Sequence, residues 1–391
     1  MIIYMDYAST SPLRPEVVEA MAPFNGDNFG NASGGHRVSR YAKKALEDAR
    51  DSIAESCGVE SGEVFFTSGG TESDNIAVLG TLGAENKRRG EPTAVVCSAV
   101  EHPAVFETFR SVGAGRGLSV GSVAPQTRLA AVDGSGVVDL GSLEEVLDQG
   151  VVLVSVMLAN NETGTIQPLS SIVDLVRRLA PDAVFHTDAV QGACYLDLAS
   201  ALSDVDVASI SAHKLGGPKG VGAVVVRKGI NVAPLFHGGG QERGLRSGTS
   251  NVAGAVGLAS ALSISQSVRE SESTRVGLLR DRLVDEIKSS VPGVTESSDR
   301  SKVLPGHAHI RFQSVDREEL VVLLDQAGVC VSAGSACSSG ALEPSRVLSA
   351  MGVDKEDARG AIRFSLGHMT TAEDVERALA VIPEAVGRLR A

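Results

Sequence analysis

Polar residues suited to chemistry stand directly after a series of short apolar runs in this sequence. They are Thr67–Asn75, Glu101 with His102, Asn160 with Asn161, Asp188 with Gln191, and Ser211 with His213 and Lys214. If each run is a strand of an open α/β sheet, these residues follow the carboxyl ends of the strands, where ligands bind in such sheets. The sequence therefore predicts one site that gathers an amine, acids, amides, imidazoles and hydroxyls.

The segment Thr67–Asn75 (TSGGTESDN) places two glycines between an expected strand and a helix that we expect to begin near Thr71. Free backbone N–H groups and the positive end of the helix dipole would bind an anion there, most simply a phosphate, with help from the hydroxyls of Ser68 and Thr71. The segment matches neither GxxxxGK[ST] nor GxGxxG, so neither an ATP loop nor a dinucleotide site is indicated. Taken alone, it fits a plain capped turn equally well.

Lys214 lies between SISAH and the glycine-rich turn LGGPKG, where an amine would be partly desolvated and able to form a Schiff base. Asp188 in HTDAVQ is either a site acid or a helix N-cap. A lysine that forms an imine, an acid that pairs with a pyridinium nitrogen and a phosphate cradle are together what pyridoxal phosphate requires. His102 in EHPAV is either structural or placed to stack on such a ring and move protons.

The chain has five cysteines with no CxxC pair, which indicates neither a disulfide framework nor a metal site. Four of them stand in apolar or helical settings and are typical of buried thiols. Cys337, in GSACSSGALEPS, is flanked by small residues on both sides. This setting predicts an exposed, mobile loop whose thiol is accessible for chemistry.

The elements that must position these residues are an alternation of strands and helices. Apolar residues recur at helical spacing between Val38 and Ala54, with Gly58 as the expected C-cap. Apolar runs separated by helices predict a mostly parallel sheet that is covered on both faces. From about Ala261 the chain changes to charged helices and two strands, HAHIRFQ and AIRFSLG. We therefore predict a large α/β domain, residues 15–260, and a smaller α+β domain, residues 1–14 and 261–391.

Composition excludes several classes of function. The 391 residues are 43% hydrophobic and carry 36 basic against 48 acidic side chains, a net charge of −12. Such a chain offers no electrostatic footprint for direct binding of nucleic acid. The most apolar run, Val151–Ala159, is far shorter than the roughly 20 residues of a membrane helix, and the chain start has no basic region before a long apolar stretch. We therefore expect a cytoplasmic protein that does not bind membranes.

With these residues assembled, the sequence resembles the NifS/IscS-type cysteine desulfurases, which are class V, fold-type I pyridoxal-phosphate enzymes. The resemblance extends from MDYAST to IRFSLGHMTT and rests on TSGGTESDN, EHPAV, NNETGTIQP, HTDAVQ, SAHKLGGPKGVG, HGGGQERGLRSGT and GSACSSGALEPS in order. It implies the transferase fold of that class, with a mostly parallel seven-stranded sheet covered by helices in the large domain. It departs from the family at Gly34 and Gly35, where proline and serine are usual, and GSAC favours the group with a long cysteine loop over the SufS-like group.

The resemblance implies three catalytic residues. Lys214 matches the imine lysine that moves the proton at the substrate Cα, Cys337 the sulfur-accepting nucleophile, and His102 the imidazole that stacks on the cofactor. The implied cofactor-binding residues are Gly70, Thr71, His102, Asn161, Asp188, Gln191, Ser211, His213, Lys214 and Thr249, the last reaching the cofactor of the other subunit of a homodimer. The implied substrate-binding residues are Arg363, Asn161 and Asn31, with the guanidinium as carboxylate clamp.

The function implied is conversion of L-cysteine to alanine, with a persulfide formed on Cys337. Its sulfur would pass to an acceptor protein for iron–sulfur clusters, thiolated tRNA or cofactors, or DNA phosphorothioation. Two alternatives stay open. Another class V lyase or aminotransferase, such as one acting on selenocysteine, would need Lys214 and Asp188 but not Cys337, and a non-catalytic sulfur-pathway scaffold would bind no cofactor.

Overall fold

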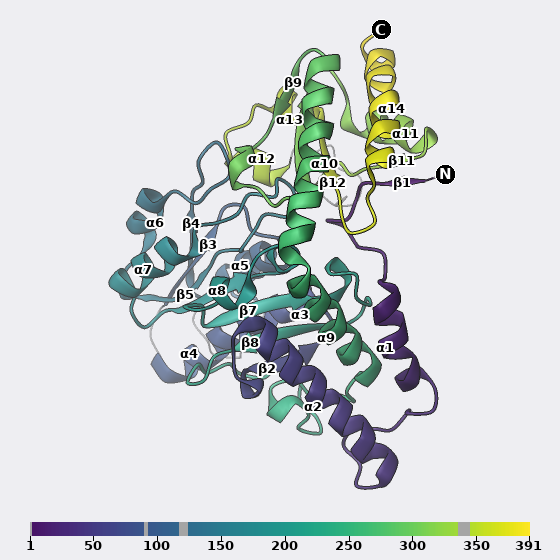
Figure 1. The fold of residues 1–391 in the computed structure, drawn as a ribbon. Coiled ribbons are helices and arrows are strands. Elements are labelled where there is room, and N and C mark those ends of the chain that lie inside the picture. The colour runs from purple at the N-terminus through teal and green to yellow at the C-terminus, as the bar shows by residue number, and fades with distance from the viewer. Residues whose placement is uncertain (1, 90–92, 117–123, 335–344) are drawn as a thin grey trace.

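A seven-stranded sheet forms the centre of the larger of two lobes (Figure 1). The computed structural model describes residues 2–89, 93–116, 124–334 and 345–391, with backbone alone for residues 86–89. In spatial order the strands are β2 (Val64–Thr67), β8 (Gly222–Val226), β7 (Val207–Ser211), β6 (Val184–Asp188), β5 (Val151–Ser155), β3 (Ala94–Ser98) and β4 (Gln126–Ala130). From β7 to β4 all neighbours are parallel, and only β8 runs against its neighbours. The predicted mostly parallel seven-stranded sheet is confirmed.

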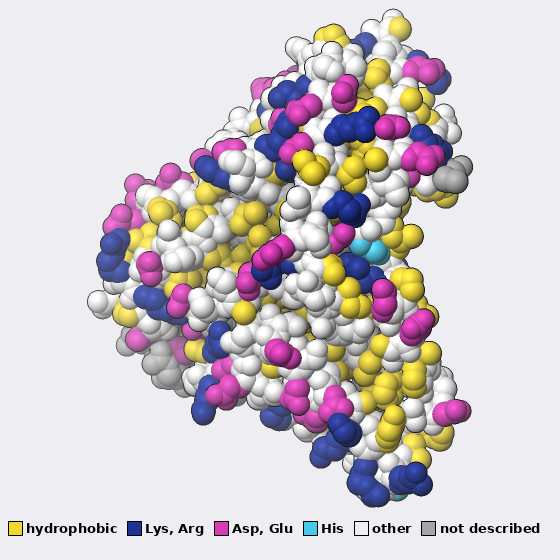
Figure 2. All heavy atoms as spheres, viewed as in Figure 1, with side chains coloured by type: hydrophobic (Ala, Val, Ile, Leu, Met, Phe, Trp, Pro, Cys, Tyr) yellow, Lys and Arg dark blue, Asp and Glu magenta, His cyan; other side chains and the backbone are white. Residues whose placement is uncertain are grey.

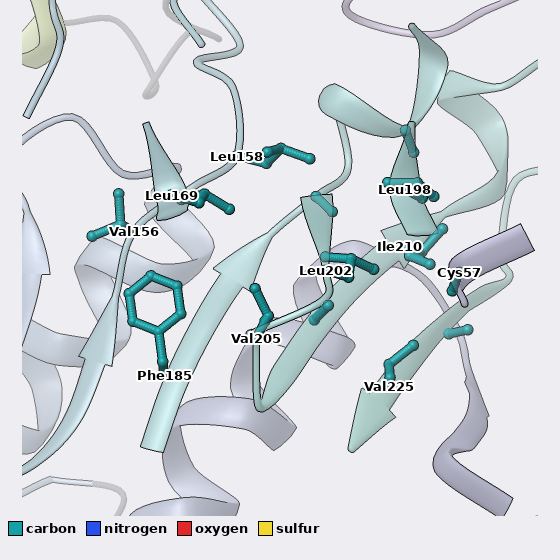
Figure 3. Packing of buried hydrophobic residues seen from close by; sticks show 14 of the residues in the cluster. Cys57, Val156, Leu158, Leu169, Phe185, Leu198, Leu202, Val205, Ile210 and Val225 are labelled. Atoms are coloured by element: carbon teal, nitrogen blue, oxygen red, sulfur yellow. The ribbon is translucent and has the colours of Figure 1, made fainter. Parts of the chain in front are cut away.

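Apolar side chains alternate between the two faces of this sheet. On β3, Ala94 and Val96 belong to one core cluster, and Val95 and Cys97 belong to another on the opposite face. The first face is covered by α2 (Arg37–Cys57), α7 (Leu169–Leu179), α8 (Leu198–Ala201) and α9 (Val252–Ser267). Figure 3 shows part of this packing, with Phe185 of β6, Ile210 of β7 and Leu202 beside α8.

The opposite face of the sheet is covered by helices that follow the strand ends. They are α3 (Gly70–Asn75), a wide helical turn (Ile76–Gly80), α4 (Thr81–Arg89) and α5 (Pro103–Gly113). Burial on both faces explains why the central strands read as continuous apolar runs rather than as an alternating pattern. β4 was missed by the sequence analysis because it is a half-exposed edge strand, with Leu129 45% exposed.

The smaller lobe is built on an antiparallel sheet of β9 (Val294–Glu296), β10 (His307–Phe312) and β12 (Ala361–Ser365). A parallel pair joins the chain start, β1 (Ile3–Tyr4), to β11 (Val329–Cys330). Both ends of the chain therefore lie on this lobe (Figure 1). Its remaining helices are α10 (Arg269–Ser290), α11 (Arg317–Gln326), α12 (Arg346–Ala350), α13 (Lys355–Arg359) and α14 (Ala372–Arg390).

The two lobes are linked by α9 and α10, which follow one another along the chain (Figure 1). The predicted domain boundary at residue 260 falls inside α9, whose Ala261 and Leu262 pack in the core of the larger lobe. The core of the smaller lobe begins on this stretch only at Val276 of α10. Because a helix that is buried against one core belongs with that core, we propose the α9–α10 junction as the boundary.

Two further expectations can be compared with the structure. The helix predicted from the spacing between Val38 and Ala54 is α2, and it ends at Gly58 in the left-handed conformation with φ 65°. In the larger lobe, α1 (Pro15–Asn25) precedes α2, and α6 (Leu140–Val146) follows β4. Within the described part of the chain, no helix is both long enough and apolar enough to span a bilayer.

Candidate active site

The polar residues that follow β2, β3, β5, β6 and β7 lie at one edge of the large sheet. The four parallel strands end at that edge by their shared direction, and β2 ends there because two antiparallel steps, through β8, restore the direction of β7. Gly222 of β8 pairs with both Thr67 and Ser211, which brings these two strand ends together. The elements thus gather the predicted groups as the alternating pattern implied.

Lys214 is half-buried at this edge, below the segment that leads from β1 to α1. Its Nζ donates hydrogen bonds to the carbonyls of Ala8 at 2.6 Å and Ser9 at 2.7 Å. Gln191 Nε2 donates to the same Ala8 carbonyl at 2.8 Å. Burial, and next the positive charge of Arg363, lower the pKa of the Lys214 amine to about 8. A minority of this amine is therefore neutral near physiological pH, but far more than for an ordinary lysine, and the neutral form is the one that a nucleophile or base requires.

Arg363 brings the smaller lobe into the site. It stands on β12 with 3% of its side chain exposed, and its guanidinium donates to Asp6 Oδ1 at 2.8 Å and Ser9 Oγ at 2.6 Å. A third hydrogen bond goes to the Asn161 carbonyl at 2.7 Å. Since Lys214 and Arg363 both contact Ser9, an amine and a fixed guanidinium lie on either side of one residue.

Asp188 forms an acidic cluster with Asp74 and His102, in which one oxygen or nitrogen of each lies within 4.8 Å of the others. Burial raises the pKa of the Asp188 carboxyl, while His102, the Val190 N–H and Lys214 act to lower it. Burial lowers the pKa of His102, whose Nδ1 accepts from the Ala104 N–H at 3.1 Å and caps α5. The other ring nitrogen is then the one available to a ligand.

The glycine turn after β2 lies where the anion cradle is expected. The first intrahelical hydrogen bond of α3 runs from Ser73 N to Gly69 O, which leaves the preceding N–H groups without a partner of this kind. A Cβ on Gly69 would meet nothing within 4 Å, whereas one on Gly70 would lie 2.9 Å from Val190 Cγ2 and 3.6 Å from Ser211 Cβ. The turn is therefore open at Gly69 and closed at Gly70 by Val190, which follows β6, and by Ser211 of β7.

Several predicted site residues are placed around this cradle. Ser211 is buried and Thr71 is exposed. His213 Nδ1 lies 3.2 Å from Thr10 Oγ1, and burial lowers its pKa to about 4, so the ring is neutral at pH 7. The loop with Thr249 is tied to the cradle helix by Arg246, whose Nε donates to Glu72 Oε1 at 2.8 Å.

Three predicted residues are not gathered with this group. Asn31 lies in an exposed turn, where its Oδ1 accepts from the Ser33 N–H at 2.9 Å, and its substrate role stays a prediction. Thr249 is exposed before α9, and its role across a subunit interface also stays a prediction. Cys337 lies outside the described residues.

Two parts of the site were missed by the sequence analysis. The segment Asp6–Ser11 covers Lys214 and holds Arg363, although the only signal was its polar composition in MDYASTS. Asp74 was treated only as part of the phosphate motif TSGGTESDN, yet its side chain lies beside Asp188. No local signal could have named this neighbour, because Asp188 stands on a strand that is distant in the sequence.

Comparisons with known proteins identify the family of the chain. The profile of the family described as Aminotransferase class-V matches residues 3–378. The chain belongs to the aminotransferase class-V family. Within that family it is 41% identical over 388 residues to a protein of Dictyoglomus turgidum named cysteine desulfurase IscS, covering 99% of this chain and 95% of that one.

Solved structures of the same kind have the same fold. A NifS-like protein superposes with a TM-score of 0.90 at 36% identity, covering 99% of this chain and 100% of that one. A structure described as SspA in complex with cysteine gives a TM-score of 0.78 at 31% identity, with coverage of 93% and 98%. The predicted relationship to NifS/IscS-type proteins is confirmed.

Proposed function

We propose that this protein is a cysteine desulfurase that uses pyridoxal 5′-phosphate to remove sulfur from L-cysteine. The observation that carries the proposal is the placement of the Lys214 amine and the Arg363 guanidinium on either side of Ser9. An α-amino acid needs a base at its Cα proton and a cation at its carboxylate, and these two positions are only one carbon–carbon bond apart. Full-length similarity to a chain named cysteine desulfurase supports cysteine as that amino acid.

The residues at the sheet edge fit pyridoxal phosphate. The open cradle at Gly69–Gly70, with Thr71 and Ser211, suits the phosphate, and buried Asp188 suits the pyridine nitrogen. His102 would stack on the ring, Gln191 and Asn161 would contact its hydroxyl side, and His213 would meet the phosphate. When bound, this cofactor supplies a sink for the electron pair that remains when Cα loses its proton.

Arg363 would orient the substrate. Its hydrogen bonds to Asp6, Ser9 and the Asn161 carbonyl hold the guanidinium plane before the substrate arrives. Bidentate binding of the carboxylate would then leave the Cα proton directed at the Lys214 amine, which takes it as a base. Burial between the lobes limits exchange of this proton with bulk water.

Cys337 would accept the sulfur. Its thiolate attacks the substrate sulfur, an S–S bond forms as the C–S bond breaks, and the carbon fragment takes up a proton to leave alanine. The persulfide sulfur then passes to an acceptor protein. Ser345, the first described residue after this loop, donates through Oγ to Glu162 Oε2 at 2.5 Å, next to Asn161. This contact anchors the chain that follows Cys337 near Asn161, which supports the role proposed for Cys337, and a free thiol suits the reducing cytoplasm.

We propose that the protein works as a homodimer, with Thr249 reaching the partner's cofactor. Apolar side chains are exposed on and beside α1 and α2, including Val18 at 48%, Phe29 at 78% and Tyr41 at 55%. Figure 2 shows hydrophobic side chains gathered over this region. A second copy of the chain would bury them.

Measuring alanine formation in wild type and in Cys337→Ala distinguishes a cysteine desulfurase from a class V lyase that does not need the thiol. Protein loaded with pyridoxal phosphate should release alanine and sulfide from L-cysteine with a reductant, and Cys337→Ala should lose this turnover by at least about 100-fold. Cys330→Ala, whose thiol lies on β11, is the matched control. Unchanged turnover by Cys337→Ala would favour a lyase that does not need the thiol, and failure to bind the cofactor would favour a scaffold.

A further inference from the structure

A chain of buried polar side chains lies under Asp188 and takes no part in the mechanism above. Ser155 Oγ of β5 is 2.8 Å from His186 Nδ1, and His186 Nε2 of β6 is 3.0 Å from Ser209 Oγ of β7. His186 Nε2 also lies 3.7 Å from Asp74 Oδ1 of α3. All four side chains are at most 1% exposed, so the chain crosses the sheet out of reach of water.

Asp74 and Asp188 are close enough that their charges are coupled, since their nearest ligand-type oxygens lie within 4.8 Å. Both residues are at most 5% exposed. Ionising both carboxyls in this buried site would cost a large electrostatic free energy, because water does not screen their repulsion. The pair therefore holds one proton at neutral pH.

The surroundings of the two carboxyls are different. His102, the Val190 N–H and Lys214 all favour the ionised form of Asp188. Asp74 faces the carboxyl of Asp188, which disfavours its charge, and with a smaller effect that of Glu101, whose own raised pKa of about 8 keeps it largely neutral at pH 7. Only the Ser209 hydroxyl favours the charge on Asp74. The proton of the pair therefore lies on Asp74, and the negative charge lies on Asp188.

His186 does not compensate a charge on Asp74. Burial lowers the pKa of this imidazole to about 3, so it is neutral, and both ring nitrogens are occupied by serine hydroxyls. Asp74 Oδ1 has no hydrogen-bond partner among the described residues. A buried ionised oxygen without a donor is costly, whereas a neutral carboxyl group in the same place costs far less.

We propose that Asp74 is a positioning residue of the cofactor site: as the neutral member of the Asp74–Asp188 pair, fixed beside the serine–histidine chain, it confines the single negative charge to Asp188. The placement of the charge on Asp188 is inferred from this site alone. Only the use of that charge, to hold a protonated pyridine nitrogen, rests on the proposed function. Asp74 touches neither substrate nor reacting atoms, and it acts through Asp188.

Proton linkage in the cofactor-free protein tests the proposal with Asp74→Asn. Because the pKa of Asp74 is higher in the folded chain than in the unfolded one, folded protein holds an extra proton as the pH rises above about 4. The ratio of the unfolding constants, wild type over variant, should then rise with pH, by up to about tenfold per unit. A ratio that is flat or falls between pH 5 and 8 would overturn the proposal.

Cofactor affinity gives the second readout, by equilibrium dialysis with pyridoxal phosphate. Asp74→Asn keeps a neutral side chain of the same shape, so its dissociation constant should stay within about threefold of wild type. Asp188→Asn, the matched control, removes the charge and should weaken binding by at least about 100-fold. Equal losses in the two variants would show that Asp74 carries charge.

A third measurement needs no variant. Wild-type protein labelled with ¹³C at the aspartate side-chain carboxyl should show a neutral carboxyl at pH 7, in the cofactor-free and the loaded form. If every aspartate is ionised, Asp74 is not the neutral partner. These titrations report on the pair even if the loaded protein shows no desulfurase turnover, so failure of this inference and failure of the proposed function are distinguishable.

Discussion

Asp188 ends β6 and Lys214 follows the adjacent strand β7. Burial shifts the pKa of both groups, but the neighbouring charge with the largest effect acts with burial at Lys214, whereas the neighbouring charges act against burial at Asp188. Burial alone favours the neutral form of both groups. Around Lys214, the neighbouring Arg363 adds to that effect and brings the pKa of the amine to about 8. Around Asp188, His102 and Lys214 oppose it. The comparison teaches that the protonation state of a buried group depends on the side chains that surround it and not on burial alone. Arg363 favours a neutral amine at Lys214 that can act as a base, and the neighbours of Asp188 favour a charged carboxylate.

The largest expected effect is on the amine side of this comparison. Lys214→Ala removes both the attachment point for the cofactor and the base at Cα, so turnover of L-cysteine should fall by at least about 1,000-fold. Alanine release by the loaded protein is the measurement. Lys219→Ala, an exposed lysine in the same glycine-rich turn, is the control and should keep wild-type turnover. Comparable losses in both variants would show that the turn, not the amine, matters.

Two variants of Arg363 distinguish the effect of its positive charge from the effect of its planar shape. Arg363→Lys keeps a cation near Lys214 but loses the planar fork, so KM for L-cysteine should rise by about 30-fold or more. Arg363→Gln loses both, and in addition removes the second cause of the lowered pKa at Lys214.

The rate of pyridoxal phosphate uptake by cofactor-free protein reports that pKa, because only the neutral amine reacts. Uptake should rise with pH to a midpoint of about 8 in wild type, and the midpoint should move to higher pH in Arg363→Gln. The midpoint of Arg363→Lys should remain near that of wild type. Identical midpoints in all three proteins would contradict the electrostatic role given to Arg363.

The smallest expected effect concerns stability on the carboxyl side. Glu101 is fully buried, accepts from Ser98 Oγ at 2.6 Å and the Met157 N–H at 2.8 Å, and burial raises its pKa to about 8. Its contribution to stability is full below the unfolded pKa and is lost as the pH rises toward 8. Relative to wild type, Glu101→Gln should therefore gain about 2–3 kcal/mol in unfolding free energy between pH 5 and 7. Urea titrations measure this, and a constant difference would mean that Glu101 ionises normally.

Much of the site was predictable because strands and turns are coded locally. Lys214, Asp188 and His102 could be placed at strand ends because apolar runs and the glycines after them are read from neighbouring residues. Asp74 could not be recognised, since its partner Asp188 stands on a strand more than a hundred residues away. The cover formed by Asp6–Ser11 was missed for the same reason, because its contacts are with Lys214 and Arg363.

The sequence by itself determined the order of strands and helices, the glycine cradle, the reactive residue types and the resemblance to NifS/IscS-type enzymes. These follow from hydrophobic periodicity and backbone preference, which act over a few residues. Only the tertiary structure decided that Arg363 of the smaller lobe shares Ser9 with Lys214, that Asp74 lies near Asp188 and that the end of α9 packs in the core of the larger lobe. Burial and Coulomb interactions depend on distances in space, and the chain sets those distances only when both lobes are folded.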